Sequence, residues 1–284
     1  MITYRATLDV PDHFAHAVAG WLAEHRLAHD IRPWQRAASP LTQAIMFLRW
    51  ARDATRVDVI ARDAGVSQAT AYRYIHEAVD VVAAHGTDLG DALGLAEASG
   101  EPFLMIDGTL VPSNRCRAKN PETGHDLWYS GKHKRHGANV QVLMDSCGYP
   151  LWASPGSPGS THDLAAAREH VLPALYPRAA RGLPVLADKG YIGAGRGIHT
   201  PVRGHSRDLD TDTRCRNQLI CDPRAPCERS NAMLKTWKCL TRDCRHCPMA
   251  CAQNVPKRPI RSRTATNDPA FPLVRALQCR GGGI

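Results

Sequence analysis

Hydrophobic residues in the first hundred positions recur at helical spacing, with few runs typical of strands. The segment 41–51 (LTQAIMFLRWA) predicts an amphipathic helix, and 57–64 (VDVIARDA) predicts a second, shorter one. The apolar side of the first helix consists of Leu41, Ile45, Met46 and Leu48. Gly65 breaks the second pattern, and a third helix is expected over 68–84 with Ser67 as its N-cap. This part of the chain is therefore predicted to be all-helical.

From about residue 102 the pattern changes to short apolar runs separated by glycine and proline turns, which is typical of strands. Strands are predicted at 103–111 (FLMIDGTLV), 138–145 (ANVQVLMD), 149–154 (YPLWAS) and 183–188 (LPVLAD). Helices are expected from Thr161 to about His170 and over 227–240 (CERSNAMLKTWKCL). The apolar stripe of the second helix consists of Met233, Leu234, Trp237 and Leu240. Strands interleaved with helices predict an α/β fold.

Residues 242–284 show no sustained periodicity and offer no face that a packed domain could bury. We therefore expect three parts. A helical domain occupies 1–98 and an α/β domain occupies 99–241. An irregular basic tail follows at 242–284, either disordered or the product of a frameshift.

The helices predicted within 57–84 have the spacing of a helix-turn-helix. Ala61 is a small residue in the first helix, Gly65 permits the tight turn, and Val66 and Ile75 supply apolar contacts. The side chains expected to face a DNA major groove are Ser67, Gln68, Thr70, Tyr72 and Arg73. A plain helical hairpin remains the alternative. Arg73 is the only cation in this set, so phosphate contacts would have to come from elsewhere.

The net charge of +9 is unevenly distributed over the 284 residues. Residues 1–100 carry 9 Lys or Arg against 12 Asp or Glu, whereas residues 101–284 carry 27 against 15. A basic surface on the larger part suits a polyanionic partner, double-stranded DNA first. The alternative is a high-GC genome, because arginine (29 residues) far outnumbers lysine (7 residues).

No segment approaches 18 consecutive apolar residues, which argues against a membrane span, and the N-terminus lacks the pattern of a secretory signal. We therefore expect a cytoplasmic, nucleoid-associated protein. Its ten cysteines are then more readily thiols or metal ligands than disulfides. A zinc site is disfavoured, because the C-terminal group has irregular spacing and a single C-x-x-C pair. That group consists of Cys239, Cys244, His246, Cys247 and Cys251.

Two apolar runs are followed by an aspartate: Asp107 in FLMIDGTL and Asp188 in VLADKGY. For Asp107 alone, the Asp-Gly pair also fits a hairpin turn between 103–106 and 109–111. Buried strands that end in carboxylates are, however, where α/β proteins place ligands and metals. Two such acids ionise together at little cost only with a positive charge between them, and a hard divalent cation supplies it. Glu228, in the first turn of a predicted helix, would be a third acid, although it also suits the helix dipole alone.

Five motifs, in order after the predicted helix-turn-helix, resemble the DDE transposases of bacterial insertion sequences. They are IDGTL, YSGKHKRHGANVQVLMD, PGSTHDLAAAR, VLADKGY and ERSNAMLKTWK. The similarity is strongest to the insertion-sequence-five-like group, related to the eukaryotic Harbinger nucleases, and covers about residues 40–241. In such proteins further helices follow the one that bears the glutamate, and the sequence after about Lys238 departs from that pattern.

The resemblance implies a ribonuclease-H-like fold, a mixed sheet flanked by helices and preceded by an all-α helix-turn-helix domain. It maps the catalytic and metal-binding triad to Asp107, Asp188 and Glu228. Two divalent cations, Mg²⁺ or Mn²⁺, would serve cleavage of transposon ends and strand transfer into target DNA by a homo-oligomer. Because of its tail, this copy could be active or an inactive relic. The alternative is a helix-turn-helix transcriptional regulator with a non-catalytic C-terminal domain.

Further residues are candidates for contacts with DNA or with the metal site. The basic run before residue 138 predicts contacts with the phosphate backbone, against the alternative of a solvated turn; it consists of Lys132, His133, Lys134, Arg135 and His136. Lys189 follows Asp188 and could contact DNA phosphate. His162 and Asp163 lie close to the metal site in proteins that this one resembles. The alternative for them is a capping box from Ser160 to Asp163.

Overall fold

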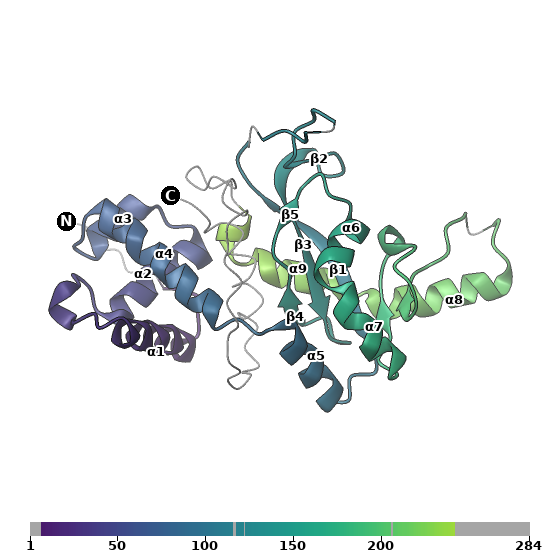
Figure 1. Ribbon diagram of the computed structural model, residues 1–284, viewed down its shortest axis with the longest axis horizontal. Helices are drawn as coiled ribbons and strands as arrows, with labels where there is room; N and C mark the ends of the chain where they lie inside the picture. Colours follow the sequence, from purple (N-terminus) through teal and green to yellow (C-terminus); the bar gives the residue numbers. More distant parts are fainter. Residues whose placement is uncertain (1–6, 116–117, 122, 206, 242–284) are drawn as a thin grey trace. The chain divides into compact units, whose positions relative to one another are not determined.

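The computed structural model describes residues 7–115, 118–121, 123–205 and 207–241 (Figure 1). These residues form two compact units. One contains 7–85 and 235–241, and the other contains 86–234. None of the helices in the described residues is long and apolar enough to cross a membrane.

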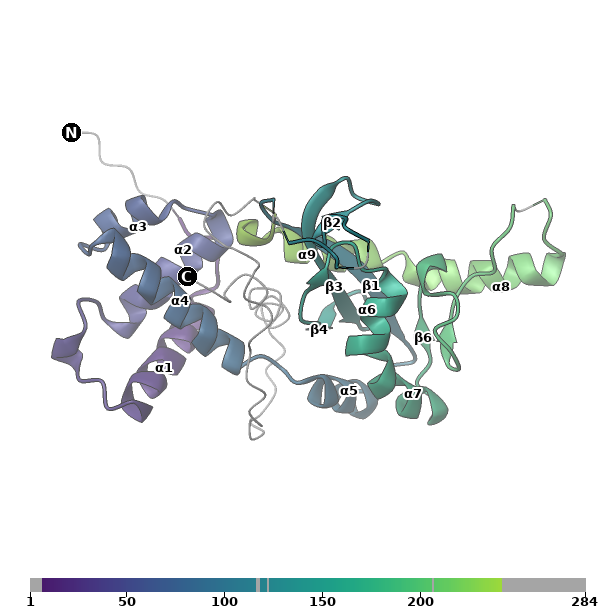
Figure 2. The same cartoon turned by 45° about the horizontal axis from the view of Figure 1, so that its top comes forward.

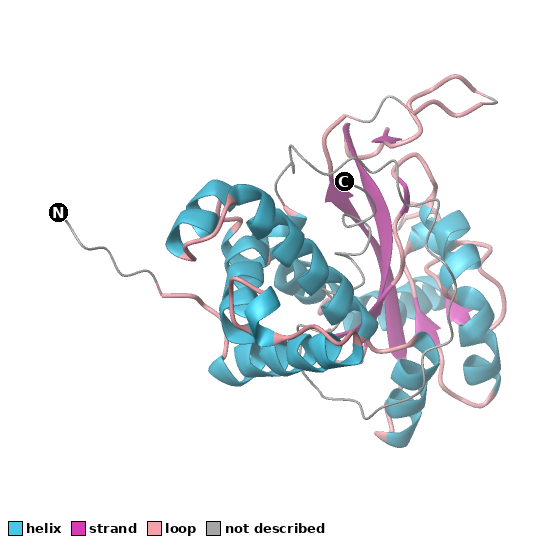
Figure 3. Ribbon diagram, turned by 60° about the vertical axis from the view of Figure 1, so that its left-hand side comes forward, coloured by secondary structure: helices cyan, strands magenta, loops and turns pink. Residues whose placement is uncertain are grey.

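The first unit is entirely helical in its described residues (Figure 3). Its α-helices are α1 (Asp12–Ala28), α2 (Pro40–Asp53), α3 (Val57–Asp63) and α4 (Gln68–Ala84), with 3-10 helices η1 (Pro33–Gln35) and η4 (Lys238–Leu240). The three helices predicted here therefore exist. The stripe predicted for α2 is half wrong, since Met46 and Leu48 are buried but Leu41 and Ile45 are exposed. Phe47 and Ala44 are buried in their place.

The turn between α3 and α4 has the expected construction. Gly65 adopts a left-handed conformation with φ of +66°, which favours glycine, and Val66 N–H donates to Ala61 O at 3.0 Å. Ser67 Oγ accepts from Thr70 N–H at 3.1 Å and caps α4 as predicted. Ile75 is fully buried and belongs, with Val66 at its edge, to the apolar cluster of this unit.

A polar cluster lies inside the helical unit, and we call it the Glu77 cluster: Arg26, Arg36, Gln43 and Glu77. The Glu77 carboxylate accepts from Arg36 Nη2 at 2.6 Å and from Gln43 Nε2 at 3.0 Å. Arg26 Nη2 donates to Gln43 Oε1 at 2.7 Å, and the Arg26 and Gln43 side chains are buried. The Glu77 carboxylate therefore has two donors, whereas the two guanidinium groups give the cluster a surplus of positive charge. Arg26 Nε is buried without a hydrogen-bond partner among the described residues.

The second unit is a mixed sheet flanked by helices. Its strands are β1 (Leu104–Pro112), β2 (Tyr129–Ser130), β3 (Arg135–Met144), β4 (Pro150–Ala153), β5 (Ser157–Pro158), β6 (Val185–Leu186) and β7 (Ile198–His199). Its helices are α5 (Leu89–Ala98), α6 (Asp163–His170), α7 (Leu172–Ala180), η2 (Lys189–Tyr191), α8 (Thr211–Cys221), η3 (Asp222–Arg224) and α9 (Cys227–Lys235). The four strands predicted from the sequence are all present, as is the helix expected near 161–170.

The sheet runs in the order β2-β3-β1-β6-β7, with β4 and β5 also paired to β3. β1 pairs antiparallel with β3 and parallel with β6, and β6 pairs parallel with β7. β1 therefore lies between two partners in the middle of a mixed sheet. A central strand is buried on both sides, which explains its run of apolar residues.

β1 does not turn at Asp107-Gly108. It continues to Pro112, and Asp107 pairs with Val142 and Gly108 with Gln141 in the ladder with β3. The hairpin alternative is therefore wrong, and Asp107 lies within the strand rather than at its end. Pairing with β3, which supplies a partner for every residue from Met105 to Pro112, outweighs the local turn preference of Asp-Gly.

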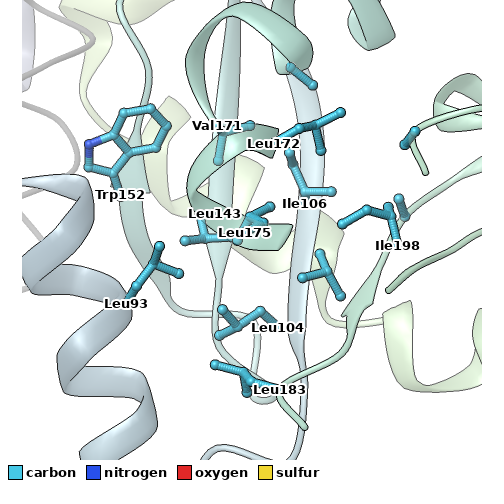
Figure 4. Packing of buried hydrophobic residues seen from close by; sticks show 14 of the residues in the cluster. Leu93, Leu104, Ile106, Leu143, Trp152, Val171, Leu172, Leu175, Leu183 and Ile198 are labelled. Atoms are coloured by element: carbon cyan, nitrogen blue, oxygen red, sulfur yellow. The ribbon is translucent and has the colours of Figure 1, made fainter. Parts of the chain in front are cut away.

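One face of the sheet carries the apolar core of this unit. Figure 4 shows Val171, Leu172 and Leu175, at the start of α7, directed towards Leu143 and Ile106 on the strands. α5 contacts both α7 and β4, and the views agree that α5 and α7 lie side by side (Figures 1 and 2). These contacts bury the alternate residues of β1 and hold the strand rigid at the level of Asp107.

Candidate active site

Asp107 is the fourth residue of β1, and its side chain points to the face opposite the apolar core. Alternation along a strand sends Leu104 and Ile106 into the core and Met105 and Asp107 towards α9. Asn231 Nδ2 of α9 donates to Asp107 Oδ2 at 2.9 Å. Asn231 was not among the site residues predicted from the sequence.

Asp188 follows β6 and begins η2. Its Oδ1 accepts from Gly190 N–H at 2.8 Å, which caps the short helix. The parallel register pairs Leu104 with Val185 and Met105 with Leu186. The same offset, continued along both strands, brings Asp107 level with Asp188. This pairing is consistent with the expectation that the two strands bring the two aspartates near each other, and their joint role stays a prediction.

The electrostatics agree with this proximity. Burial raises the pKa of Asp107 above its usual range, and the neighbouring Asp188 carboxylate raises it further. The Arg224 guanidinium and the hydrogen bond from Asn231 act in the opposite direction without cancelling these effects. Burial and the neighbouring carboxylate disfavour ionisation in this position, and a cation beside it would stabilise the ionised form.

Asp163, the first residue of α6, is the third acid near this point. A Cβ added to Gly108 would lie 2.5 Å from Asp163 Oδ1, so the absence of a side chain at 108 makes room for the carboxylate. A Cβ at Gly190 would lie 3.7 Å from Asp163 Oδ2. The Asp163 carboxylate therefore sits between the residue that follows Asp107 and the turn capped by Asp188. We call Asp107, Asp163 and Asp188 the aspartate centre.

A chain of buried hydrogen bonds, which we call the Asp163 relay, leads to this acid. Tyr191 OH donates to Gln141 Oε1 at 2.6 Å, and Gln141 Nε2 donates to Asn139 Oδ1 at 2.9 Å. Asn139 Nδ2 then donates to Asp163 Oδ1 at 2.7 Å and to Thr161 O at 3.0 Å. Tyr191, Gln141 and Asn139 are at most 6% exposed. The relay thus joins the segment after Asp188, through β3, to the start of α6.

The assignment of donors and acceptors along the relay follows from the Asp163 carboxylate at its end. Asn139 faces two acceptors, the Asp163 carboxylate and a backbone carbonyl, so its amide nitrogen must point to them. Its oxygen then requires a donor from Gln141, whose own oxygen in turn requires the Tyr191 hydroxyl. Burial raises the pKa of Tyr191 well above its usual value, and Asp163, Asp107 and Asp188 add to the effect. The phenol therefore stays protonated and remains a donor.

Lys132 is the cation nearest to this relay. Its Nζ donates to Asp163 Oδ2 at 3.1 Å. Partial burial opposes the Lys132 charge, but the hydrogen bond and charge of Asp163, followed by the charges of Asp188 and Asp107, raise the pKa of the ammonium overall. Lys132 is thus paired with Asp163, and its predicted contact with the phosphate backbone stays a prediction.

Glu228 lies in the first turn of α9 and is exposed. Within the described residues, no hydrogen bond or ion pair joins its carboxylate to Asp107 or Asp188. Asn231, one turn further along, makes the contact with Asp107 instead. The helix expected over 227–240 is also shorter, because α9 ends at Lys235. The role of Glu228 as third acid stays a prediction.

The capping-box alternative for Asp163 is wrong. His162 is the N-cap of α6, and its Nδ1 accepts from Leu164 N–H at 3.3 Å. Ser160 Oγ instead donates to Leu127 O at 2.7 Å. The Asp163 side chain is therefore available to the relay and to Lys132 rather than to the helix end.

The other DNA-binding candidates lie mostly on the surface. Lys134, Arg135 and Lys189 are exposed, as are Ser67, Gln68 and Arg73 at the start of α4, while Thr70 and Tyr72 are half-buried. Arg73 Nη2 donates to Thr70 Oγ1 at 3.2 Å. These positions leave the predicted DNA contacts sterically open.

The cysteines add no centre to the described part of the chain. Cys215 and Cys221 are exposed, whereas Cys227 and Cys239 are buried. Cys227 Sγ lies 3.4 Å from Met105 Sδ, and burial raises the pKa of its thiol to about 11, so it packs as an uncharged side chain. Cys244, His246, Cys247 and Cys251 of the zinc alternative lie outside the described residues, as does the predicted tail.

The donors near Asp107 fit a hard divalent cation in their chemistry. Asp107 and Asp188 supply carboxylates, and Asn231 Oδ1 is a buried oxygen without a hydrogen-bond partner among the described residues. As placed, no three Asp, Glu, His or Cys side chains in the described ranges lie close enough together to hold an ion. Two aspartates and an unpartnered amide oxygen are therefore the candidate donors on the described residues.

A mixed sheet flanked by helices, with one aspartate in β1 and another just after its parallel neighbour β6, is consistent with the class of nucleases. The family model for the DDE superfamily endonuclease matches residues 106–257, more than half of the chain. The chain belongs to this family. The matched range includes Asp107, Asp188 and Glu228, and it continues to residue 257, beyond Lys238, where the last quoted motif ends. No curated protein and no solved structure matches the chain.

Proposed function

We propose that this protein is a DDE transposase of the insertion-sequence-five-like group, with a ribonuclease-H-like catalytic domain that cuts and joins DNA at transposon ends. The observation that carries the proposal is the parallel pairing of β1, which contains Asp107, with β6, which is followed by Asp188, inside the range of the family match. Strand transfer and end recognition are parts of the proposal that follow from the resemblance in its motifs.

Asp107 and Asp188 would hold divalent cations, Mg²⁺ or Mn²⁺, with Glu228 as the third acid. When bound, such ions activate the attacking oxygen and stabilise the leaving one in phosphoryl transfer. The contribution of the chain is position. β1 fixes the Asp107 backbone between two strands, and Asn231 Nδ2 orients the carboxylate from the other side.

DNA would be held by exposed cations around this centre and by the helical unit. Lys134, Arg135 and Lys189 are exposed and would contact phosphates. α3 and α4 would form the helix-turn-helix, with Gln68 and Arg73 near the start of the recognition helix. Such proteins pair two DNA ends, so the active form would be a homo-oligomer on DNA.

The test is Mg²⁺-dependent nicking of a duplex that carries the terminal sequences flanking the coding region. We expect nicking by the natural chain and its loss in Asp107→Asn and Asp188→Asn, with Glu169→Gln as a control that removes an exposed acid elsewhere on α6. Nicking that survives both aspartate substitutions would overturn the proposal. DNA binding without any nicking would favour a relic or a helix-turn-helix regulator.

Glu228→Gln tests the third acid separately. Loss of nicking would mean that α9 brings Glu228 to the aspartates once cations and DNA are bound. Unchanged nicking would assign the third carboxylate to another residue and leave the function intact.

A further inference from the structure

We propose that Lys132 is a built-in counter-ion of the aspartate centre, which neutralises part of its charge in the metal-free protein and competes there with divalent cations. The inference rests on the metal-dependent function proposed above. It assigns to Lys132 a part in cation binding that is separate from contact with DNA.

The two members of the pair are held very differently. The Asp163 side chain is 15% exposed, whereas that of Lys132 is 64% exposed. The relay fixes Asp163 through Asn139, at 2.7 Å, and the missing side chain at Gly108 leaves it room. Lys132 comes from the turn between β2 and β3 and is tied only at its tip in the contacts of the described residues. The carboxylate is therefore fixed, and the ammonium can leave.

The ammonium also acts beyond its direct partner. Asp188 and Asp107 both contribute to raising the pKa of Lys132, although only Asp163 is hydrogen-bonded to it. The same three carboxylates act on Tyr191. All three carboxylates thus stabilise the charge of Lys132, whereas in an ordinary surface ion pair a single partner does so.

The charges of the centre explain why such a cation is useful. Asp188 raises the pKa of Asp107, all three carboxylates raise the pKa of Tyr191, and Arg224 is a second cation that acts on Asp107. Without Lys132 the metal-free centre would hold more uncompensated negative charge, which destabilises the fold. With Lys132 in place, a divalent cation that binds near the aspartates is repelled by the lysine ammonium. The cation therefore binds less tightly than the carboxylates alone would allow.

The experiment measures Mn²⁺ affinity of the full chain without DNA, by titration calorimetry. Lys132→Gln should tighten Mn²⁺ binding roughly three- to tenfold, as expected for removal of one partly exposed like charge. The same variant should unfold at a lower temperature in EDTA and show a larger increase in Tm on addition of Mn²⁺. Lys132→Arg keeps the charge and should behave like the natural chain.

Lys134→Gln is the matched control, because it removes the same charge two positions along the same turn. Its Mn²⁺ affinity should stay within about twofold of the natural chain. Equal tightening in Lys134→Gln would show a general charge effect and overturn the role of Lys132. Unchanged or weaker Mn²⁺ binding in Lys132→Gln would also overturn it.

Asp107→Asn separates this inference from the function on which it rests. If the natural chain binds Mn²⁺ and Asp107→Asn does not, the metal centre stands, and only the Lys132 result decides the inference. If the natural chain binds no Mn²⁺, or Asp107→Asn binds it equally well, the proposed function itself fails.

Discussion

Each of the two units contains a polar cluster among packed elements, and the two clusters differ in their balance of charge. In the Glu77 cluster the carboxylate accepts from Arg36 and Gln43, and Arg26 completes the set. In the aspartate centre Lys132 is paired with Asp163 and is stabilised by all three carboxylates, while Arg224 acts on Asp107. The Glu77 cluster thus has more cations than carboxylates, whereas the aspartate centre has a surplus of negative charge that a further cation would neutralise. The comparison indicates that surplus negative charge, rather than burial of polar groups, distinguishes the candidate site.

The largest expected effect is on catalysis. Asp107→Asn should lower Mg²⁺-dependent nicking by about a thousandfold or more, because it removes a charged ligand from a site where charge stabilisation carries the reaction. Single-turnover nicking rates measure the effect. A loss of less than tenfold would place the centre elsewhere.

Glu77→Gln should lower the free energy of unfolding by about 2 kcal/mol, because Arg36 and the buried Gln43 lose their charged acceptor. Urea titration followed by circular dichroism measures the change. Asp107→Asn in EDTA is the matched comparison, since it should not destabilise the fold. If the two substitutions changed stability in the same direction, the contrast between the clusters would be wrong.

Tyr191→Phe should lower the free energy of unfolding by about 1 kcal/mol, since it leaves the buried Gln141 oxygen without its donor. Tyr176→Phe is a control in the same unit, because Tyr176 OH donates to a backbone carbonyl and its side chain is partly exposed. A smaller loss in Tyr191→Phe than in Tyr176→Phe would mean that the relay is not a structural element.

The smallest expected effect concerns the direction in which the stability of the fold changes with pH. The pKa of Asp107 is raised in the folded chain, so between pH 3.8 and that raised value the folded state binds more protons than the unfolded state. In EDTA the contribution of Asp107 to stability should therefore fall as pH rises through this window. The contribution of Asp107 is measured by comparing how Tm depends on pH in the natural chain and in Asp107→Asn. A contribution that rises with pH would contradict the burial argument.

Much of the fold could be predicted from the sequence, because its helices and strands are locally consistent. Ser67 caps α4, and four apolar runs form strands as their patterns predict. The wrong predictions lie where contacts between residues distant in the sequence determine the structure. Asp107-Gly108 favours a turn locally, but the ladder with β3 keeps it extended. Leu41 and Ile45 fit a helical stripe, and the packing of α2 buries other residues.

Part of the candidate site followed from the sequence. The repeated pattern of an apolar run before an aspartate drew attention to Asp107 and Asp188, whose role stays a prediction, but the relay was missed. A signal for it exists: Asn139 and Gln141 are two amides at alternate positions in a strand that is otherwise apolar, and such a pair must find partners when buried. The partners themselves, Tyr191 and Asp163, could not be found, because no local pattern encodes which distant side chains meet.

The parallel pairing of β1 with β6 has a consequence for synthesis of the chain. Asp107 and Asp188 lie 81 residues apart in the sequence, so they meet only after a long segment has been made and closed into the sheet. When β1 and β3 have been synthesised, Asp107 is present but Asp188 has not yet been translated. The two aspartates therefore come together only after the intervening segment has been translated and folded into the sheet.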